Sequence, residues 1–218
     1  EYENFTFLEA VKSLADRVGM ELPEISYSQK EQQERDLKTK LLEINKIAAT
    51  YYYHQLKSEN GQVGLSYLRK RGLTDETINR FGLGYSGQNS KALYRYLKDK
   101  GYDDDLLKES GLFTYERGIN DKFWNRVMFP IMDINNKVIG FGGRVMGDAK
   151  PKYLNSPETK LFDKSRNLYG LNIARTARKN NLIICEGYMD VISMHQAGFN
   201  QAVASLGTAL TPGQARLM

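Results

Sequence analysis

The chain has 218 residues, of which 41% are hydrophobic and 11% aromatic, so one large or two small domains with a buried core are expected. It has one cysteine and two histidines, which excludes an internal disulfide and the usual kind of zinc cluster and favours a reduced, cytosolic setting. No apolar run approaches the roughly 18–20 residues that span a membrane, and the first residues lack the basic-then-apolar pattern of a signal peptide.

The net charge of +5 is unevenly distributed along the chain. Between Arg117 and Asn180 there are 13 Lys/Arg against 5 Asp/Glu, a net charge of +8 for that stretch. Positive charge concentrated in this way suggests a phosphate or nucleic-acid partner. Because composition does not show whether these charges share a face, a solvated lysine-rich surface is the alternative.

Apolar residues recur at three- and four-residue steps from Phe5 to Val18, which predicts an amphipathic helix that stops at Gly19. Residues 23–40 are polar and lose this periodicity, which favours a polar linker in which part of the chain could be helical. Residues 1–22 are therefore expected to belong to a preceding module.

A helical region follows the expected linker. The sequence predicts one longer helix and four short ones, over residues 41–56 and then about 61–70, 74–81, 90–99 and 103–109. Thr74 suits the N-cap of one of them, with two acidic residues in its first turn, where the helix dipole favours them.

The character changes to β after Asn120. The runs Arg126–Met132 and Lys137–Val145 are rich in β-forming residues, and the Asn135-Asn136 pair between them predicts a hairpin. Pro130 indicates that the first of these strands lies at an edge or has a bulge there.

The last part of the chain has the pattern of a parallel βαβ unit. An apolar strand over 182–185 is followed by a helix over 189–197 and a second strand over 201–205, and Thr211-Pro212 opens another helix. The expected fold class is α+β, with a helical and β-hairpin N-terminal subdomain followed by the start of an α/β unit that is incomplete.

Glu186 and Asp190 are the first candidates for chemistry. Glu186 directly follows the apolar strand, at the carboxyl end where open α/β sheets place their ligands, and Asp190 lies one turn on. Two carboxylates there suit Mg²⁺, which is held by few protein oxygens plus phosphates. The alternative is that both only cap the helix N-terminus.

A basic series is the second candidate site, and it consists of Arg126, Arg144, Lys152, Lys164 and Arg166. Gly142-Gly143 before Arg144 would let a phosphate approach the backbone, although two glycines there could equally mark a bulge. The loop over 152–162 presents lysine, tyrosine and asparagine that could hold a nucleotide, or it is an ordinary surface turn.

Other residue types narrow the range of functions. We interpret Cys185 as a packing residue, and Tyr51, Tyr52, Tyr53 and Trp124 as core or helix-packing residues. No Walker-type glycine loop and no serine, histidine and acid arrangement of a hydrolase is visible in the sequence.

Taken together, several segments resemble the bacterial DnaG-type primase family in order and spacing. They are Arg126–Ile131, Val138–Arg144, Pro151–Thr159, Leu168–Gly170, Glu186–Asp190 and Ala202–Thr208. The resemblance implies that residues 1–22 are the tail of a zinc-ribbon domain and 23–40 a linker. It also implies that 41–180 are the N-terminal subdomain of the polymerase core and that 181–218 begin a toprim fold.

The family resemblance implies a DNA primase, a DNA-directed RNA polymerase that makes short RNA primers on single-stranded DNA during replication by metal-dependent nucleotidyl transfer. The implied cofactor is Mg²⁺, for which Mn²⁺ substitutes, with zinc only in the N-terminal domain that is missing here. Glu186 matches the metal-binding glutamate of toprim enzymes and Asp190 an accessory acid. The later Asp-x-Asp pair of such enzymes does not occur before Met218, so the fragment alone is expected to be inactive.

The resemblance also implies nucleotide- and template-binding residues, namely Arg71, Lys122, Arg126, Arg144, Lys152, Tyr153, Asn155 and Lys164. The implied partners are single-stranded DNA, ribonucleoside triphosphates, a replicative helicase bound through a C-terminal domain, and guanosine tetra- or pentaphosphate as an inhibitor. The implied location is the cytoplasm, with the nucleoid. Two alternatives are a toprim module that binds nucleic acid without chemistry, as in recombination mediators, and a toprim nuclease, against which the basic hairpin argues.

Overall fold

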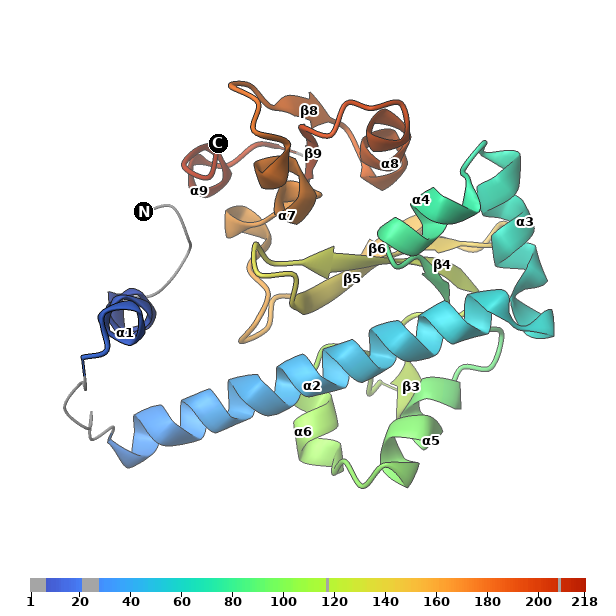
Figure 1. The fold of residues 1–218 in the computed structure, drawn as a ribbon. Helices are drawn as coiled ribbons and strands as arrows, with labels where there is room; N and C mark the ends of the chain where they lie inside the picture. Colours follow the sequence, from blue (N-terminus) through green and yellow to red (C-terminus); the bar gives the residue numbers. More distant parts are fainter. Residues whose placement is uncertain (1–6, 21–27, 117, 208) are drawn as a thin grey trace. The chain divides into compact units, whose positions relative to one another are not determined.

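The computed structural model describes residues 7–20, 28–116, 118–207 and 209–218 (Figure 1). The chain divides into two compact units, residues 1–37 and 38–218. Among the described residues, no helix is both long and apolar enough to cross a membrane.

The first unit contains helix α1 (Phe7–Val18) and the beginning of helix α2 (Gln29–Lys57). The predicted first helix is confirmed from Phe7 onward, and residues 5 and 6 lie outside the described residues. Residues 29–40 of the expected linker are helical, which agrees with the partly helical linker that the sequence allowed.

The reason for the early start of α2 is local. Ser28 and Glu31 form a reciprocal cap, in which Glu31 N–H donates to Ser28 Oγ over 3.3 Å and Ser28 N–H donates to the Glu31 carboxylate over 2.9 Å. The following residues are mostly good helix formers, and an exposed helix does not need an apolar face.

The second unit continues α2 and adds the short helices that the sequence predicts. Their bounds are η1 (Glu59–Gly61), α3 (Gln62–Lys70), α4 (Asp75–Arg80), α5 (Ala92–Asp99) and α6 (Asp104–Glu109). Thr74 is confirmed as the N-cap of α4, where its hydroxyl accepts from Thr77 N–H over 3.2 Å. Between α6 and the central sheet, β2 (Phe113–Thr114) pairs with β3 (Asn120–Asp121).

An antiparallel sheet forms the centre of this unit, in the order β1 (Gly84–Tyr85), β4 (Arg126–Met132), β5 (Val138–Val145) and β6 (Tyr153–Asn155). The predicted hairpin is confirmed as β4 and β5. β1 pairs only with Val127 and Met128, so Pro130 lies where β4 has no partner on that side. The register shifts just beyond it, between Ile131 and Met132, which agrees with the expected irregularity.

Aromatic residues cover both faces of this sheet. Tyr52 of α2 packs edge-on against Phe141 of β5, with ring centroids 5.5 Å apart, on the face along which α2 runs in Figure 1. On the other face Tyr188 stacks on Phe129 of β4, at 5.0 Å and an interplanar angle of 9°. The sheet is therefore a buried layer between α2 and the C-terminal part of the chain.

The C-terminal part contains the predicted βαβ unit, made of β8 (Ile183–Cys185), α8 (Tyr188–Gln196) and β9 (Ala202–Ser205), with β8 and β9 parallel. A strand that the sequence did not indicate, β7 (Leu168–Tyr169), adds antiparallel to β9. The remaining helices are η2 (Lys164–Arg166), α7 (Leu171–Ala174), η3 (Arg175–Ala177) and α9 (Pro212–Ala215). The α+β class, with the start of an α/β unit, is confirmed.

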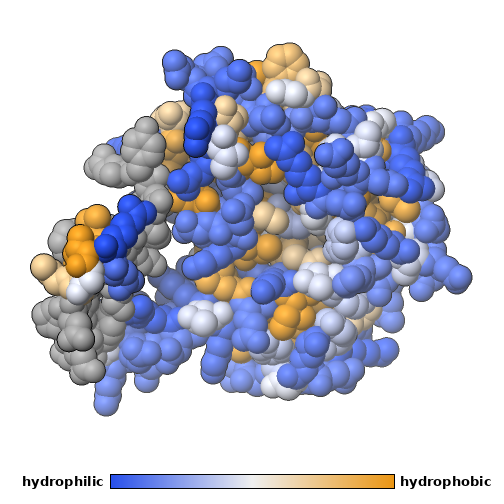
Figure 2. Space-filling view, in the orientation of Figure 1, coloured by the Kyte–Doolittle hydropathy of each residue, from blue (hydrophilic) through white to orange (hydrophobic). Residues whose placement is uncertain are grey.

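Most of the surface visible in Figure 2 is hydrophilic, with hydrophobic side chains showing in smaller groups between the polar ones. The large apolar residues of β4 and β5 are buried, among them Phe129 and Phe141, which are fully buried.

Candidate functional site

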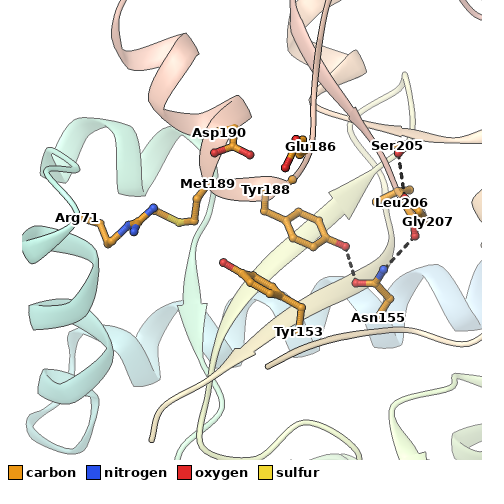
Figure 3. Close-up of a pocket in the computed structure, with 11 residues that line it drawn as sticks. Arg71, Tyr153, Asn155, Glu186, Tyr188, Met189, Asp190, Ser205, Leu206 and Gly207 are labelled. Carbon is orange, nitrogen blue, oxygen red and sulfur yellow. Dashed lines mark hydrogen bonds between the residues drawn. The ribbon is translucent and has the colours of Figure 1, made fainter. Parts of the chain in front are cut away.

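A cavity of about 450 Å³ lies where the carboxyl end of β8 and the first turn of α8 meet β6 (Figure 3). Its lining consists of Arg71, Tyr153, Asn155, Glu186, Gly187, Tyr188, Met189, Asp190, Ser205, Leu206 and Gly207. Five of the residues singled out from the sequence, from three separate segments, meet here.

The two candidate carboxylates lie at the start of α8. Glu186 follows β8, Gly187 is the N-cap residue, and Asp190 is in the first turn. Within the described residues neither carboxylate has an ion pair or a side-chain hydrogen bond, and no side chain caps α8. Helix capping by hydrogen bonds therefore does not account for them, and both are available to a ligand in the cavity.

The floor of the cavity is held by Tyr188 and Asn155. The Tyr188 hydroxyl donates to Asn155 Oδ1 over 2.7 Å, and Asn155 Nδ2 donates to the Leu206 carbonyl over 3.0 Å (Figure 3). Burial raises the pKa of Tyr188 well above its usual value, so the hydroxyl stays protonated and remains a donor. Asn155, predicted as a binding residue, thus joins β6 to the segment after β9.

Gly142 and Gly143 have a different role from the one that the sequence suggested. A Cβ at Gly142 would lie 2.4 Å from Tyr188 Cζ, and one at Gly143 would lie 2.8 Å from a Phe123 ring atom. Both glycines are buried, and β4 and β5 pair there without a bulge. They provide room for two aromatic rings, so both the phosphate-approach and the bulge interpretations are wrong.

A basic and aromatic group lies beside the carboxylates. Arg71 ends α3 and extends toward Met189 in Figure 3. The Arg144 guanidinium lies 4.2 Å above the centre of the Tyr67 ring. Tyr153 is 40% exposed, and burial of the rest of its side chain raises its pKa, which the nearby charges of Arg144 and Arg71 partly offset. Cations and an exposed ring beside carboxylates suit a nucleotide with a metal ion. The sequence did not indicate that Tyr67 would pack against Arg144.

Arg126 is buried and bonded to the backbone. Its side chain is buried, and Nη1 donates to the carbonyls of Gly143, at 3.1 Å, and Pro151, at 3.0 Å. The predicted contact of Arg126 with nucleotide or template gains no support from this position and stays a prediction. Because its cation is used on backbone carbonyls, Arg126 holds the segment that leads to Lys152, which is exposed.

Lys122 and Lys164 form a second basic group. Burial lowers the pKa of Lys122, and the like charge of Lys164 lowers it further, so the two ammonium groups are near each other. Lys122 lines a hollow of about 460 Å³ together with Trp124, which is 46% exposed, contrary to its interpretation as a packing residue.

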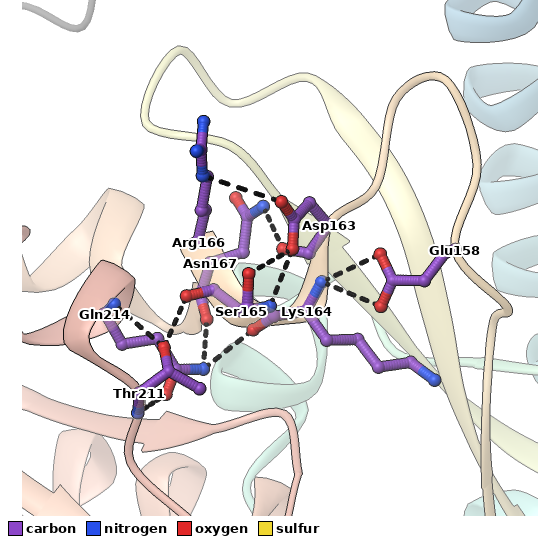
Figure 4. Close-up of polar contacts among 8 residues, drawn as sticks. All are labelled: Glu158, Asp163, Lys164, Ser165, Arg166, Asn167, Thr211 and Gln214. Atoms are coloured by element: carbon purple, nitrogen blue, oxygen red, sulfur yellow. Dashed lines mark hydrogen bonds and ion pairs between the residues drawn. The ribbon is translucent and has the colours of Figure 1, made fainter.

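The segment that carries Lys164 is fixed to the end of the described chain (Figure 4). Gln214 Nε2 donates to the carbonyls of Lys164, at 2.8 Å, and Asn167, at 2.9 Å, and the Lys164 N–H donates to the Glu158 carboxylate. The Lys164 side chain itself has no ion pair among the described residues. The backbone is held while the ammonium group remains available.

Comparison with known proteins gives concordant matches. Residues 51–175 match the family model for the N-terminal domain of the DNA primase catalytic core, and residues 180–218 match the toprim domain. The DNA primase of Clostridium acetobutylicum is 48% identical over 223 residues, which cover 99% of this chain and 36% of the relative. That of Deinococcus radiodurans is 45% identical and covers 100% of this chain and 37% of the relative.

Solved structures agree with these matches. A DnaG primase catalytic domain bound to single-stranded DNA is 40% identical, with a TM-score of 0.78, over 84% of this chain and 58% of that one. The RNA polymerase domain of Mycobacterium tuberculosis DnaG is 34% identical, also with a TM-score of 0.78, over 82% of this chain and 60% of that one. The chain spans little more than a third of the length of the two curated relatives.

Proposed function

Because this chain belongs to the bacterial DnaG-type DNA primase family, we propose that it forms part of a DNA-directed RNA polymerase that makes short RNA primers on single-stranded DNA. The observation that carries the proposal is the cavity in which Glu186 and Asp190 meet Arg71 and Tyr153. Two unpaired carboxylates beside cations and an exposed ring suit a triphosphate bound with a metal ion.

The donor set fits a divalent metal ion. Glu186 and Asp190 offer oxygen ligands at the carboxyl end of the parallel strand β8. The described residues contain no group of three or more His, Cys, Asp or Glu that could hold an ion without further ligands. Mg²⁺ accepts one or two protein carboxylates when substrate phosphates complete its coordination. We therefore assign Glu186 and Asp190 to Mg²⁺, with Mn²⁺ as a substitute. When bound, the ion supplies neutralisation of charge on the reacting phosphates.

The cations divide into two roles in this proposal. Arg71 and Arg144, with Lys152, bind the triphosphate, since the two arginines adjoin Tyr153 at the edge of the cavity. Lys122 and Lys164 bind the phosphates of the DNA template, in keeping with the DnaG catalytic domain that has been solved with single-stranded DNA. Asn155 and Tyr188 support this surface from below.

The wider organisation belongs to the same proposal. We propose that the N-terminal subdomain of the polymerase core extends to about residue 180 and that a toprim subdomain begins at residue 181. Zinc is proposed for a domain that precedes them. The proposed partner is a replicative helicase, and the proposed inhibitor is guanosine tetra- or pentaphosphate. The proposed location is the cytoplasm, with the nucleoid. The alternative of a toprim module without chemistry is not favoured, because the match to the primase catalytic core covers residues 51–175.

The test is nucleotide binding in the presence of Mg²⁺, measured by calorimetry on the intact protein. Arg144→Ala should weaken binding about ten-fold or more, because a charge-assisted hydrogen bond contributes roughly 1.5–3 kcal/mol. Arg95→Ala is the charge-matched control, since Arg95 is an exposed arginine on α5, away from the cavity residues. Absence of nucleotide binding by the wild-type protein at low salt would refute the proposal.

A further inference from the structure

The turn that carries Arg71 is held by a side chain more than a hundred residues away. Gln196 Nε2 donates to the Gly72 carbonyl over 2.9 Å, and Gln196 Oε1 accepts from Thr74 N–H, also over 2.9 Å. One carboxamide therefore satisfies both a carbonyl and an N–H of the connection between α3 and α4, where Gly72 has a positive φ of 82°.

The turn also has hydrogen bonds within its own segment. Leu73 N–H already donates to the Leu68 carbonyl over 3.2 Å, the Arg69 guanidinium pairs with Asp75 at 3.0 Å, and Thr74 caps α4. What Gln196 adds is the attachment of this turn to α8.

The end of α8 that carries Gln196 is well fixed. His195, the preceding residue, is buried, and its Nε2 lies 2.8 Å from the Ala202 carbonyl at the start of β9. Its ring also packs edge-on against Phe81, just after α4, with centroids 5.3 Å apart. The last turn of α8 is thus anchored to β9 on one side and to the α4 region on the other.

The opposite end of the same helix carries the carboxylates of the cavity. Asp190 lies in its first turn and Glu186 precedes it. Nine helical residues span about 13 Å, so α8 acts as a short rod between the acidic end of the cavity and the turn that bears Arg71. Arg71 lines the same cavity as Glu186 and Asp190.

We propose that Gln196 is a positioning residue for nucleotide binding: through α8 it fixes the distance and direction from the Glu186–Asp190 end of the cavity to the guanidinium of Arg71. The inference rests on the proposed function, because it assigns Arg71 to the triphosphate. Gln196 is not among the residues that line the cavity. Its effect on the reaction passes through Arg71.

The experiment compares Gln196→Ala and Gln196→Met with the wild type in the intact protein, by primer synthesis at varied ribonucleotide concentration. Methionine keeps the length of the stem and removes both hydrogen bonds, so an effect shared by both variants does not come from lost packing. The KM for nucleotide should rise about three- to ten-fold, the loss expected for one or two neutral hydrogen bonds, while kcat changes less than about two-fold. Gln62→Ala is the matched control, because among the described residues the Gln62 amide donates to the Ser58 carbonyl, four residues earlier in the chain.

A double variant separates positioning from a general structural role. If Gln196 acts through Arg71, Gln196→Ala should add no further rise in KM to a protein that already carries Arg71→Ala. An additive effect, an unchanged KM in both Gln196 variants, or a fall in kcat alone would overturn the inference. A wild-type protein that neither binds nor uses nucleotide would instead refute the proposed function, and the inference with it.

Discussion

Replacement of Gly142 by alanine tests the packing beneath the candidate site. The added Cβ would lie 2.4 Å from Tyr188 Cζ and 2.6 Å from its hydroxyl oxygen, so the ring must move. Overpacking of this kind costs about 1–3 kcal/mol. Displacement of the ring also puts at risk the hydrogen bond to Asn155, worth about 1 kcal/mol, so a loss of about 2–4 kcal/mol in the free energy of unfolding is expected.

Urea denaturation followed by circular dichroism measures this loss. Gly207→Ala is the matched control, since a Cβ there meets nothing within 4 Å, and it should change the free energy of unfolding by less than about 0.5 kcal/mol. In a Tyr188→Leu background, Gly142→Ala should cost less than in the wild type, because the smaller side chain leaves room. If the Gly142→Ala variant is as stable as the Gly207→Ala variant, Gly142 does not confine the Tyr188 ring.

Three other predictions concern the carboxylates and the basic surface. Glu186→Gln should lower primer synthesis by the intact protein about 10²-fold or more. Its binding of single-stranded DNA, followed by fluorescence anisotropy, should stay near the wild-type value. Normal primer synthesis by this variant would show that Glu186 is not part of the metal site. The affinity for single-stranded DNA should fall steeply with salt, with a slope of log affinity against log salt concentration of about −0.7 per phosphate contact. Lys164→Ala should make that slope shallower by about one contact. An affinity that does not change with salt would refute binding through the DNA phosphates. Burial raises the pKa of Asp121 to about 6 despite hydrogen bonds from the backbone at the start of α5. Between about pH 4 and 6 the folded state therefore keeps the Asp121 carboxyl protonated, whereas the unfolded state loses the proton. The free energy of unfolding of the wild type, relative to Asp121→Asn, should fall as the pH rises through that range. An increase over that range in urea denaturation would contradict the assignment.

Much of the fold follows from local patterns in the sequence. The hairpin of β4 and β5 and the βαβ unit could be predicted because strand runs, turn residues and helix caps such as Thr74 and Thr211 act within a few residues of one another. The start of α2 could not be located from the sequence, because apolar periodicity does not detect a helical segment whose side chains are mostly exposed. β7 was missed because a two-residue strand has almost no pattern of its own.

The site was predictable by residue type but not by contact. Glu186 could be found because a carboxylate after an apolar strand lies at a known edge of the sheet. The burial of Arg126 could not be predicted, because its three carbonyl partners become neighbours only when β5 and the segment before β6 fold beside it. The same limit applies to Gly142, whose required contact is a ring from a helix 46 residues further along the chain.

The bonds of Asn155 have a consequence for cooperativity. This one side chain joins β6 of the antiparallel sheet to the first turn of α8 and to the segment after β9. Opening either sheet must then break contacts that belong to the other, so local unfolding of the two should be coupled. We expect the backbone amides of β5 and β9 to be protected from hydrogen exchange as one unit, so that a ligand held at the carboxylates slows exchange in strands on both sides of the cavity.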